Sequence, residues 1–162
     1  MDLGAGLCSM RNPSCVVCPL LRDCTAGRSG TAESYPVKPA KKAKPHRTGT
    51  AYWIERESNV WLVRRNGSGM LGGMRALPDD GWSARTDGSG VAPVEAEWRE
   101  LSVRVAHVFT HFEIDLAIAV TAWPGDAAGP GEGEWWPVKS LDNAGLPTLF
   151  TKVAKTVIAS GE

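Results

Sequence analysis

Four cysteines lie within 17 residues near the N-terminus, and they restrict the possible fold of this region more than any other feature. Their spacing is Cys8-x6-Cys15-x2-Cys18-x5-Cys24. Residues 1–31, which carry them, contain few β-branched apolar side chains, so this segment cannot fold around a hydrophobic core and needs a covalent or metal staple. Two disulfides across such short loops would gain little loop entropy. The spacing therefore favours four ligands around one metal centre.

The identity of that centre is open on spacing alone. Structural zinc sites usually combine two C-x2-4-C pairs separated by a longer loop, and only Cys15 and Cys18 form such a pair. An iron–sulfur cubane spans a larger distance between its corners, which suits three wider and uneven gaps. The favoured interpretation is a [4Fe–4S] cluster, zinc is the alternative, and free thiols or disulfides are also open.

Charge is distributed unevenly along the chain. The totals of 18 Lys+Arg and 18 Asp+Glu cancel. Residues 1–50 carry eight of the bases and three of the acids, a net charge of +5, whereas residues 51–162 carry ten bases and fifteen acids, a net charge of −5. This asymmetry predicts a contact with a polyanion at the N-terminal part, although a solvated lysine-rich linker would give the same count.

No sequence feature indicates a membrane or secreted protein. The longest apolar stretch is far shorter than the roughly 20 residues of a membrane-spanning helix, and the N-terminus lacks a basic start followed by an apolar segment. We therefore expect a soluble cytoplasmic protein, where clustered cysteines more often bind metal than form disulfides.

Composition divides the chain into three parts. Residues 1–31 contain all the cysteines. Residues 32–49 contain three prolines and four lysines without periodicity, which predicts an extended connector with solvated lysines, Lys44 among them. Residues 50–162 form the globular body.

The body has the patterns of a sheet with one helix. The runs 50–57 and 59–65 predict a β-hairpin. A second pair of runs, 102–109 and 112–120, alternates in hydrophobicity and meets at a polar turn. Residues 149–158 place apolar side chains at helical spacing behind a proline, which predicts an amphipathic helix. The expected fold is α+β, a mixed and mostly antiparallel sheet with a covering helix.

Together these motifs resemble the endonuclease III superfamily, and within it the MutY-type adenine DNA glycosylases. The resemblance rests on the cysteine spacing and on the segments YPVKPAKKAKPHR, VWLVRRNGSGMLGGMRALP and HVFTHFEIDL, which occur in the family's order and cover almost the whole chain. It implies a [4Fe–4S] cluster whose four ligands are Cys8, Cys15, Cys18 and Cys24. It also implies that the cluster loop presents basic residues to DNA phosphates, here Arg11, Arg22 and Arg28. These arginines could instead neutralise the anionic cluster.

The body resembles the Nudix-like C-terminal domain with which such enzymes recognise 8-oxoguanine. The family reads the damaged base with an aromatic–serine–histidine turn, which corresponds here to Phe109, Thr110 and His111. The resemblance implies that the Thr110 hydroxyl hydrogen-bonds to 8-oxoguanine, that the aromatic side chain can wedge, and that His111 supports the turn or contacts the DNA backbone. His111 could also be an ordinary histidine at a strand end, and His107 is expected to pack in the sheet.

Two departures from known enzymes limit the expected activity. The acidic residues after Gly72-Gly73 do not follow the G-x5-E-x7-R-E-x-x-E-E pattern of Nudix pyrophosphatases, so we expect no nucleotide hydrolysis. The helical domain that excises adenine in the family is absent, and residues 1–7 resemble the end of its last helix.

The sequence therefore predicts the C-terminal portion of an adenine DNA glycosylase that removes adenine mispaired with 8-oxoguanine or guanine in base-excision repair. This portion is expected to bind the cluster, contact double-stranded DNA and recognise the lesion, as a monomer in the bacterial cytoplasm near the nucleoid, and to be inactive as a glycosylase by itself. The alternatives are a Nudix-type hydrolase of oxidised nucleotides and a zinc-stabilised DNA-binding module.

Overall fold

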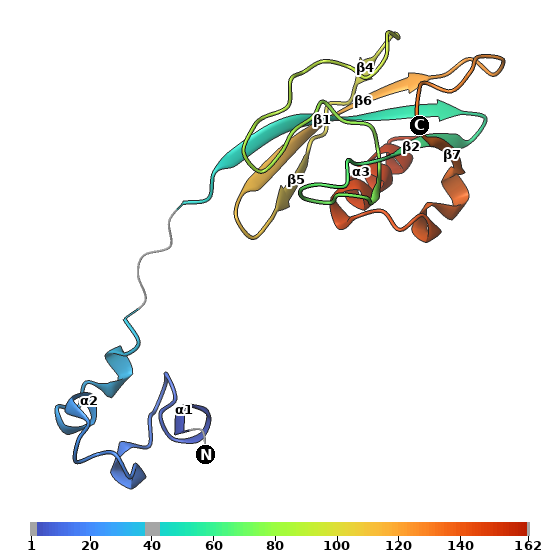
Figure 1. The fold of residues 1–162 in the computed structure, drawn as a ribbon. Coiled ribbons are helices and arrows are strands. Elements are labelled where there is room, and N and C mark those ends of the chain that lie inside the picture. Colours follow the sequence, from blue (N-terminus) through green and yellow to red (C-terminus); the bar gives the residue numbers. More distant parts are fainter. Residues whose placement is uncertain (1–2, 38–42, 162) are drawn as a thin grey trace. The chain divides into compact units, whose positions relative to one another are not determined.

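The chain forms two compact units in a computed structural model that describes residues 3–37 and 43–161 (Figure 1). The N-terminal unit is Met1–Ala43 and the C-terminal unit is Lys44–Glu162. Lys44 and the residues up to 49, expected in the connector, thus belong to the C-terminal unit. The connector lysines Lys41 and Lys42 lie outside the described residues.

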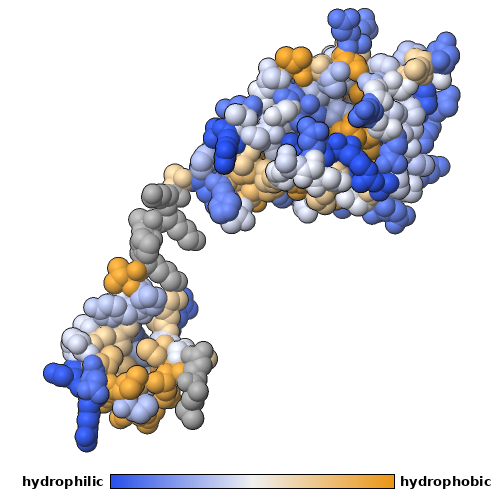
Figure 2. All heavy atoms as spheres, viewed as in Figure 1, coloured by the Kyte–Doolittle hydropathy of each residue, from blue (hydrophilic) through white to orange (hydrophobic). Residues whose placement is uncertain are grey.

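The N-terminal unit consists of short helical turns joined by loops. They are α1 (Leu3–Gly6), η1 (Cys15–Val17), α2 (Thr25–Arg28) and η2 (Ala32–Ser34). None of residues 3–37 is buried. Large apolar side chains stay at the surface, among them Val16 with 91% and Val17 with 68% of its area exposed, and Figure 2 shows apolar residues gathered on this unit. The described part of the unit therefore has no hydrophobic core, as its composition predicts.

The C-terminal unit is a mixed sheet with a helix packed on it. Its elements are β1 (His46–Arg56), β2 (Asn59–Arg64), β3 (Arg75–Ala76), β4 (Arg99–Glu100), β5 (Val105–Val108), β6 (Glu113–Ala122), β7 (Glu134–Pro137), η3 (Val138–Asn143) and α3 (Thr148–Ala159). The strand order is β3-β2-β1-β6-β4, with β7 also paired to β2 and β5 to β6. The predicted α+β class is confirmed.

The centre of the sheet is a parallel pair. β1 and β2 form the expected antiparallel hairpin, and Glu57 and Ser58 at its turn both have positive φ, 49° and 60°, as a two-residue type I′ turn requires. β1 also pairs with β6 in parallel, from His46 opposite Glu113 to Glu55 opposite Ala122. This parallel pair differs from the mostly antiparallel sheet that the sequence predicts. Alternating hydrophobicity shows which face of the sheet a residue is on, but it does not show the direction of the neighbouring strand. The parallel register places the starts of both strands at one end of the sheet.

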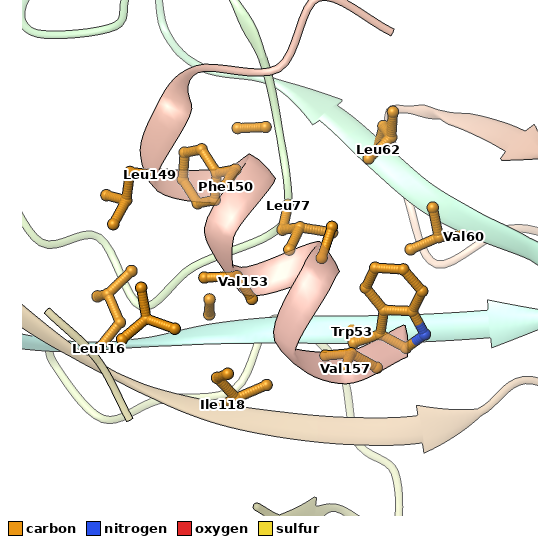
Figure 3. Close-up of a cluster of buried hydrophobic side chains, with 14 of the residues drawn as sticks. Trp53, Val60, Leu62, Leu77, Leu116, Ile118, Leu149, Phe150, Val153 and Val157 are labelled. Carbon is orange, nitrogen blue, oxygen red and sulfur yellow. The ribbon is translucent and has the colours of Figure 1, made fainter. Parts of the chain in front are cut away.

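The hydrophobic core lies between the sheet and α3. Leu149, Phe150, Val153 and Val157 of the helix face the sheet, and Trp53 is among the strand residues that they meet (Figure 3). The predicted C-terminal helix is confirmed, with one correction: Ile158 is 46% exposed, because it lies at the edge of the apolar stripe in the last turn of the helix. Within the described residues, no helix is long and apolar enough to cross a bilayer.

Candidate functional site

The four cysteines of the N-terminal unit line one hollow. Cys8 follows α1, Cys15 begins η1, Cys18 ends it and Cys24 precedes α2. All four border a space of about 590 Å³. This cysteine hollow is otherwise lined largely by apolar side chains, which include Leu7, Met10, Leu21 and Pro36. Four thiols from three short turns therefore border one volume.

Short turns hold these cysteines in place. The amide of Cys18 donates to the carbonyl of Cys15 over 3.1 Å, and the sulfur of Cys24 accepts from the amide of Gly27 over 3.4 Å. The loop between the first two cysteines is joined to a distant segment, because the amide of Asn12 donates to Glu33 Oε1 over 3.1 Å. Hydrogen bonds of the backbone thus fix the path of the chain around the hollow.

The sequence predicts that the four cysteines hold a metal centre, with an iron–sulfur cluster as the favoured interpretation and zinc as the alternative. Among residues 3–37 and 43–161, no three His, Cys, Asp or Glu side chains are arranged to hold one metal ion. In a [4Fe–4S] cluster each cysteine binds a different iron atom, so the four sulfurs can lie farther apart than around one zinc ion. Cys8, Cys15, Cys18 and Cys24 are accordingly the residues that could hold such a group.

The three arginines predicted to meet DNA are all exposed. Arg11 lies in the loop between the first two cysteines, and Arg28 Nη1 donates to the carbonyl of Arg22 over 3.4 Å. In the described part of the chain, no acidic side chain forms an ion pair with any of the three. Their charges are therefore available to an anionic partner.

The tip of the turn between β5 and β6 is formed by Thr110 and His111, both exposed. This β5–β6 turn, residues 109–112, is closed by the amide of Phe109, which donates to the carbonyl of Phe112 over 2.8 Å. The two strands pair in register, with Val108 opposite Glu113. A hydroxyl and an imidazole thus stand at the end of a hydrogen-bonded hairpin.

Phe109 itself is packed against the body. Its ring is half-buried and stacks on Phe112, with centroids 4.7 Å apart and planes at 17°. His107 meets the same ring edge-on at 4.5 Å, and Trp82 lies 6.3 Å away. The expectation that this aromatic side chain can wedge into a partner stays a prediction, and in this structure the ring is packed at the base of the turn. Phe109 thus fixes the base of the turn.

His107 is half-buried in β5, in line with the expectation that it packs in the sheet. Its Nδ1 is buried and has no hydrogen-bond partner in the part of the chain that the structure describes. Burial lowers the pKa of His107, and the nearby charge of Lys152 lowers it further. Both effects disfavour the protonated form of His107 in the folded chain.

Sequence reasoning missed a contact made by Lys44. Its Nζ donates to the carbonyl of Phe109 over 2.7 Å, and the next residue, Pro45, accepts from the amide of Glu113 over 3.0 Å. Lys44 was expected to be a solvated connector lysine. No sequence signal could reveal this contact, because it depends on the parallel pairing that brings the start of β1 next to the start of β6.

Charged side chains of both signs lie at each end of the sheet. Where β1 and β6 begin, Arg47 pairs with Asp87 over 3.9 Å and Arg104 pairs with Asp115 over 3.0 Å. Lys44 lies at the same end, beside the β5–β6 turn. At the opposite end, the glutamates Glu55, Glu57 and Glu97 border a hollow that Arg56 and Arg99 also line.

A second hollow, of about 660 Å³, lies between the loop after β2 and the segment that follows β3. Arg65 at its wall pairs with Asp79 over 2.6 Å and lies over the Trp82 ring at 4.3 Å. Burial raises the pKa of Asp79 even though Arg65 opposes the shift. The neighbouring Asp80 is buried and accepts from the amide of Gly90 over 3.3 Å. Asp79 and Asp80, the first two acidic residues after Gly72-Gly73, thus make contacts within the C-terminal unit.

Comparison with known proteins agrees with this architecture. A family model for the NUDIX domain matches residues 49–156. An adenine DNA glycosylase of Buchnera aphidicola subsp. Acyrthosiphon pisum is 39% identical over 64 residues, which are 40% of this chain and 18% of the relative. An adenine DNA glycosylase of Buchnera aphidicola subsp. Schizaphis graminum is 22% identical over 158 residues, 94% of this chain and 46% of the relative. The chain thus spans less than half the length of these relatives.

Solved structures share the fold of the C-terminal unit. The C-terminal domain of mouse MUTYH, determined in complex with human PCNA, superposes with a TM-score of 0.54 at 20% identity over 70% of this chain and 88% of that one. A MutT protein from Methanosarcina mazei Go1 gives a TM-score of 0.51 at 15% identity over 75% of this chain and 99% of that one. At these identities the similarity demonstrates a common fold.

Proposed function

The chain belongs to the NUDIX domain family, and from this premise we propose that it is the lesion-recognising, DNA-contacting portion of an adenine DNA glycosylase. The enzyme would remove adenine paired with 8-oxoguanine or guanine in base-excision repair. One named glycosylase matches across 94% of the chain, and so over both units rather than over the NUDIX domain alone. The residues that excise adenine belong to a domain outside this chain, which is therefore inactive as a glycosylase by itself.

The observation that carries the proposal is the exposed tip of the β5–β6 turn on a rigid base. 8-Oxoguanine differs from guanine in having a donor at N7 and an acceptor oxygen at C8. The Thr110 hydroxyl can accept from the one or donate to the other. The backbone amides of Thr110 and His111 form no hydrogen bond within the described residues, so they too can donate to the C8 oxygen. The contact that would distinguish the damaged base is the one in which the Thr110 hydroxyl accepts from the N7–H, because guanine carries no hydrogen at N7.

The cysteine hollow supports the second part of the proposal. Cys8, Cys15, Cys18 and Cys24 would hold a [4Fe–4S] cluster, which when bound ties the four turns together and takes no part in excising the base. A group of this kind supplies the cohesion that residues 3–37 lack, since none of them is buried. Arg11, Arg22 and Arg28 then contact DNA phosphates and contribute affinity without reading sequence. The protein acts as a monomer on double-stranded DNA in the bacterial cytoplasm, where it associates with the nucleoid.

The direct test replaces the hydroxyl at the tip of the turn. Thr110→Val keeps the shape and removes the hydrogen-bonding group. We expect it to reduce the preference of the chain for duplexes with 8-oxoguanine·adenine over guanine·adenine by about 1–3 kcal/mol, the scale of one base contact. Thr121→Val, at the opposite end of β6, is the matched control and should leave the preference unchanged. An unaltered preference in Thr110→Val would exclude the turn from lesion recognition.

The NUDIX match itself favours one other function, the hydrolysis of oxidised nucleotides. Magnesium-dependent turnover of 8-oxo-dGTP by the purified chain would establish that activity and replace our proposal. We expect no turnover, because the acidic residues after Gly72-Gly73 do not follow the G-x5-E-x7-R-E-x-x-E-E pattern of Nudix pyrophosphatases.

A further inference from the structure

We propose that Lys44 is a positioning residue, which sets the direction in which the β5–β6 turn presents the amide of Thr110. This inference rests on the proposed role of the turn in reading 8-oxoguanine. Lys44 Nζ donates to the carbonyl oxygen of Phe109 over 2.7 Å. No other group in the described part of the chain is seen to bond that carbonyl.

The geometry of the peptide bond links this contact to the tip of the turn. The carbonyl of Phe109 and the N–H of Thr110 belong to one planar trans peptide, so they point in opposite directions and rotate together. A side chain that holds the carbonyl therefore also fixes the direction of the amide. This amide, unpaired within the described residues, is one of the donors that the turn offers to the C8 oxygen of the lesion.

The peptide between Phe109 and Thr110 lies between two parts of the turn that are bonded to the rest of the unit. On one side, the amide of Phe109 is bonded to Phe112 over 2.8 Å and the two rings stack at 4.7 Å. On the other side, the amide of Glu113 is bonded to the carbonyl of Pro45 over 3.0 Å. That second bond also keeps the backbone next to Lys44 beside the turn. Both ends of the turn are fixed, and the Lys44 ammonium fixes the peptide between them.

A direct phosphate contact is the competing role for an exposed lysine beside the β5–β6 turn. The two roles differ in what they change. A lost phosphate contact weakens all duplexes alike and makes the slope of log K against log salt shallower by about one. A lost positioning contact lowers the preference for 8-oxoguanine and leaves the salt slope as it was.

The test compares three variants of the full 162-residue chain. Lys44→Met removes the donor and keeps the aliphatic stem, Lys44→Arg restores a donor, and Lys155→Met removes an equal charge from the exposed face of α3. We expect Lys44→Met to reduce the preference for 8-oxoguanine over guanine duplexes about 3- to 10-fold, the scale of one hydrogen bond, at an unchanged salt slope. Lys44→Arg should recover most of the preference, and Lys155→Met should retain it.

A second readout needs no DNA. The NMR order parameter of the Thr110 amide should fall from about 0.85 toward 0.6 or less in Lys44→Met and recover in Lys44→Arg. An unchanged order parameter, or a uniform loss of affinity with a shallower salt slope, would overturn the inference. Thr110→Val separates it from the proposed function. If Thr110→Val keeps the wild-type preference for 8-oxoguanine duplexes, or if the wild-type chain has no such preference, the proposed role of the turn is wrong. If Thr110→Val lowers the preference and Lys44→Met does not, only the role of Lys44 is wrong.

Discussion

His107 of β5 lies in an environment that differs from that of a surface histidine. Its ring contacts the Phe109 ring edge-on at 4.5 Å. Its Nδ1 is buried and has no hydrogen-bond partner within the described residues. A ring in this position cannot gain a proton without placing a charge next to Lys152 and in poor contact with water. Protonation of His107 is therefore less favourable in the folded chain than in the unfolded chain.

This environment predicts a pH effect on stability. Because burial and Lys152 lower the pKa of His107, the unfolded chain takes up a proton at this residue more readily than the folded chain, so protonation favours unfolding. The free energy of unfolding should fall as the pH drops from above about 6.5, the ordinary histidine value, through the lowered pKa of the folded state. His107→Phe should lose less stability than wild type between pH 7 and pH 5, as measured by urea denaturation.

Tryptophan fluorescence is a suitable probe for this measurement, because all seven tryptophans lie in the C-terminal unit. His46→Phe is the matched control, since His46 is exposed at the start of β1. It should keep the wild-type dependence on pH. Equal losses of stability in His107→Phe and wild type would show that His107 does not contribute.

The positions of some residues of the candidate site could be predicted from the sequence, and those of others could not. Thr110 and His111 were placed at a hairpin tip because two polar residues separate two alternating apolar runs. The packing of Phe109 and the bond from Lys44 were not predicted, since both depend on neighbours distant in the chain. Local patterns identified the tip of the turn, and tertiary contacts determine what holds it.

At the scale of elements, α3 and the parallel β1–β6 pair determine where the turn lies. The helix was predictable from apolar residues repeating every three or four positions behind Pro147. The parallel pairing was not predictable, because the alternation of apolar residues does not depend on the direction of the neighbouring strand. Only that pairing brings Lys44 and the β5–β6 turn to the same end of the sheet.

The helix offers a direct test of which face is buried. Leu149→Ala should lower the free energy of unfolding of the C-terminal unit by about 2–5 kcal/mol, because a side chain with 1% of its area exposed leaves a cavity in the core. Ile158→Ala, with 46% of the side chain exposed, should cost far less. Urea denaturation followed by tryptophan fluorescence measures both. Similar losses in the two variants would contradict the observed orientation of α3.

At the scale of the whole molecule, the chain combines two units with different sources of stability. The C-terminal unit has a continuous hydrophobic core, whereas no residue in the described part of the N-terminal unit is buried. Composition predicted this contrast, because residues 1–31 combine all four cysteines with few apolar side chains suited to a core. The two units should therefore respond separately to damage.

Removal of one cysteine tests this separation. We expect Cys18→Ser to lose the metal centre and unfold the N-terminal unit, because a structural metal site contributes its binding energy to folding. The C-terminal unit should keep its wild-type denaturation curve by tryptophan fluorescence. Ser14→Ala, in the same loop, is the control and should retain the metal. Full iron content in Cys18→Ser would contradict the ligand assignment.

The iron, sulfide and zinc content of the anaerobically purified chain, together with its visible spectrum, tests whether this NUDIX domain is part of a cluster-bearing adenine DNA glycosylase. We expect about four irons and four sulfides per chain, the composition of a four-cysteine [4Fe–4S] cluster, with broad brown absorbance. One zinc and no colour would rule out the cluster and make the N-terminal unit a zinc-stabilised module.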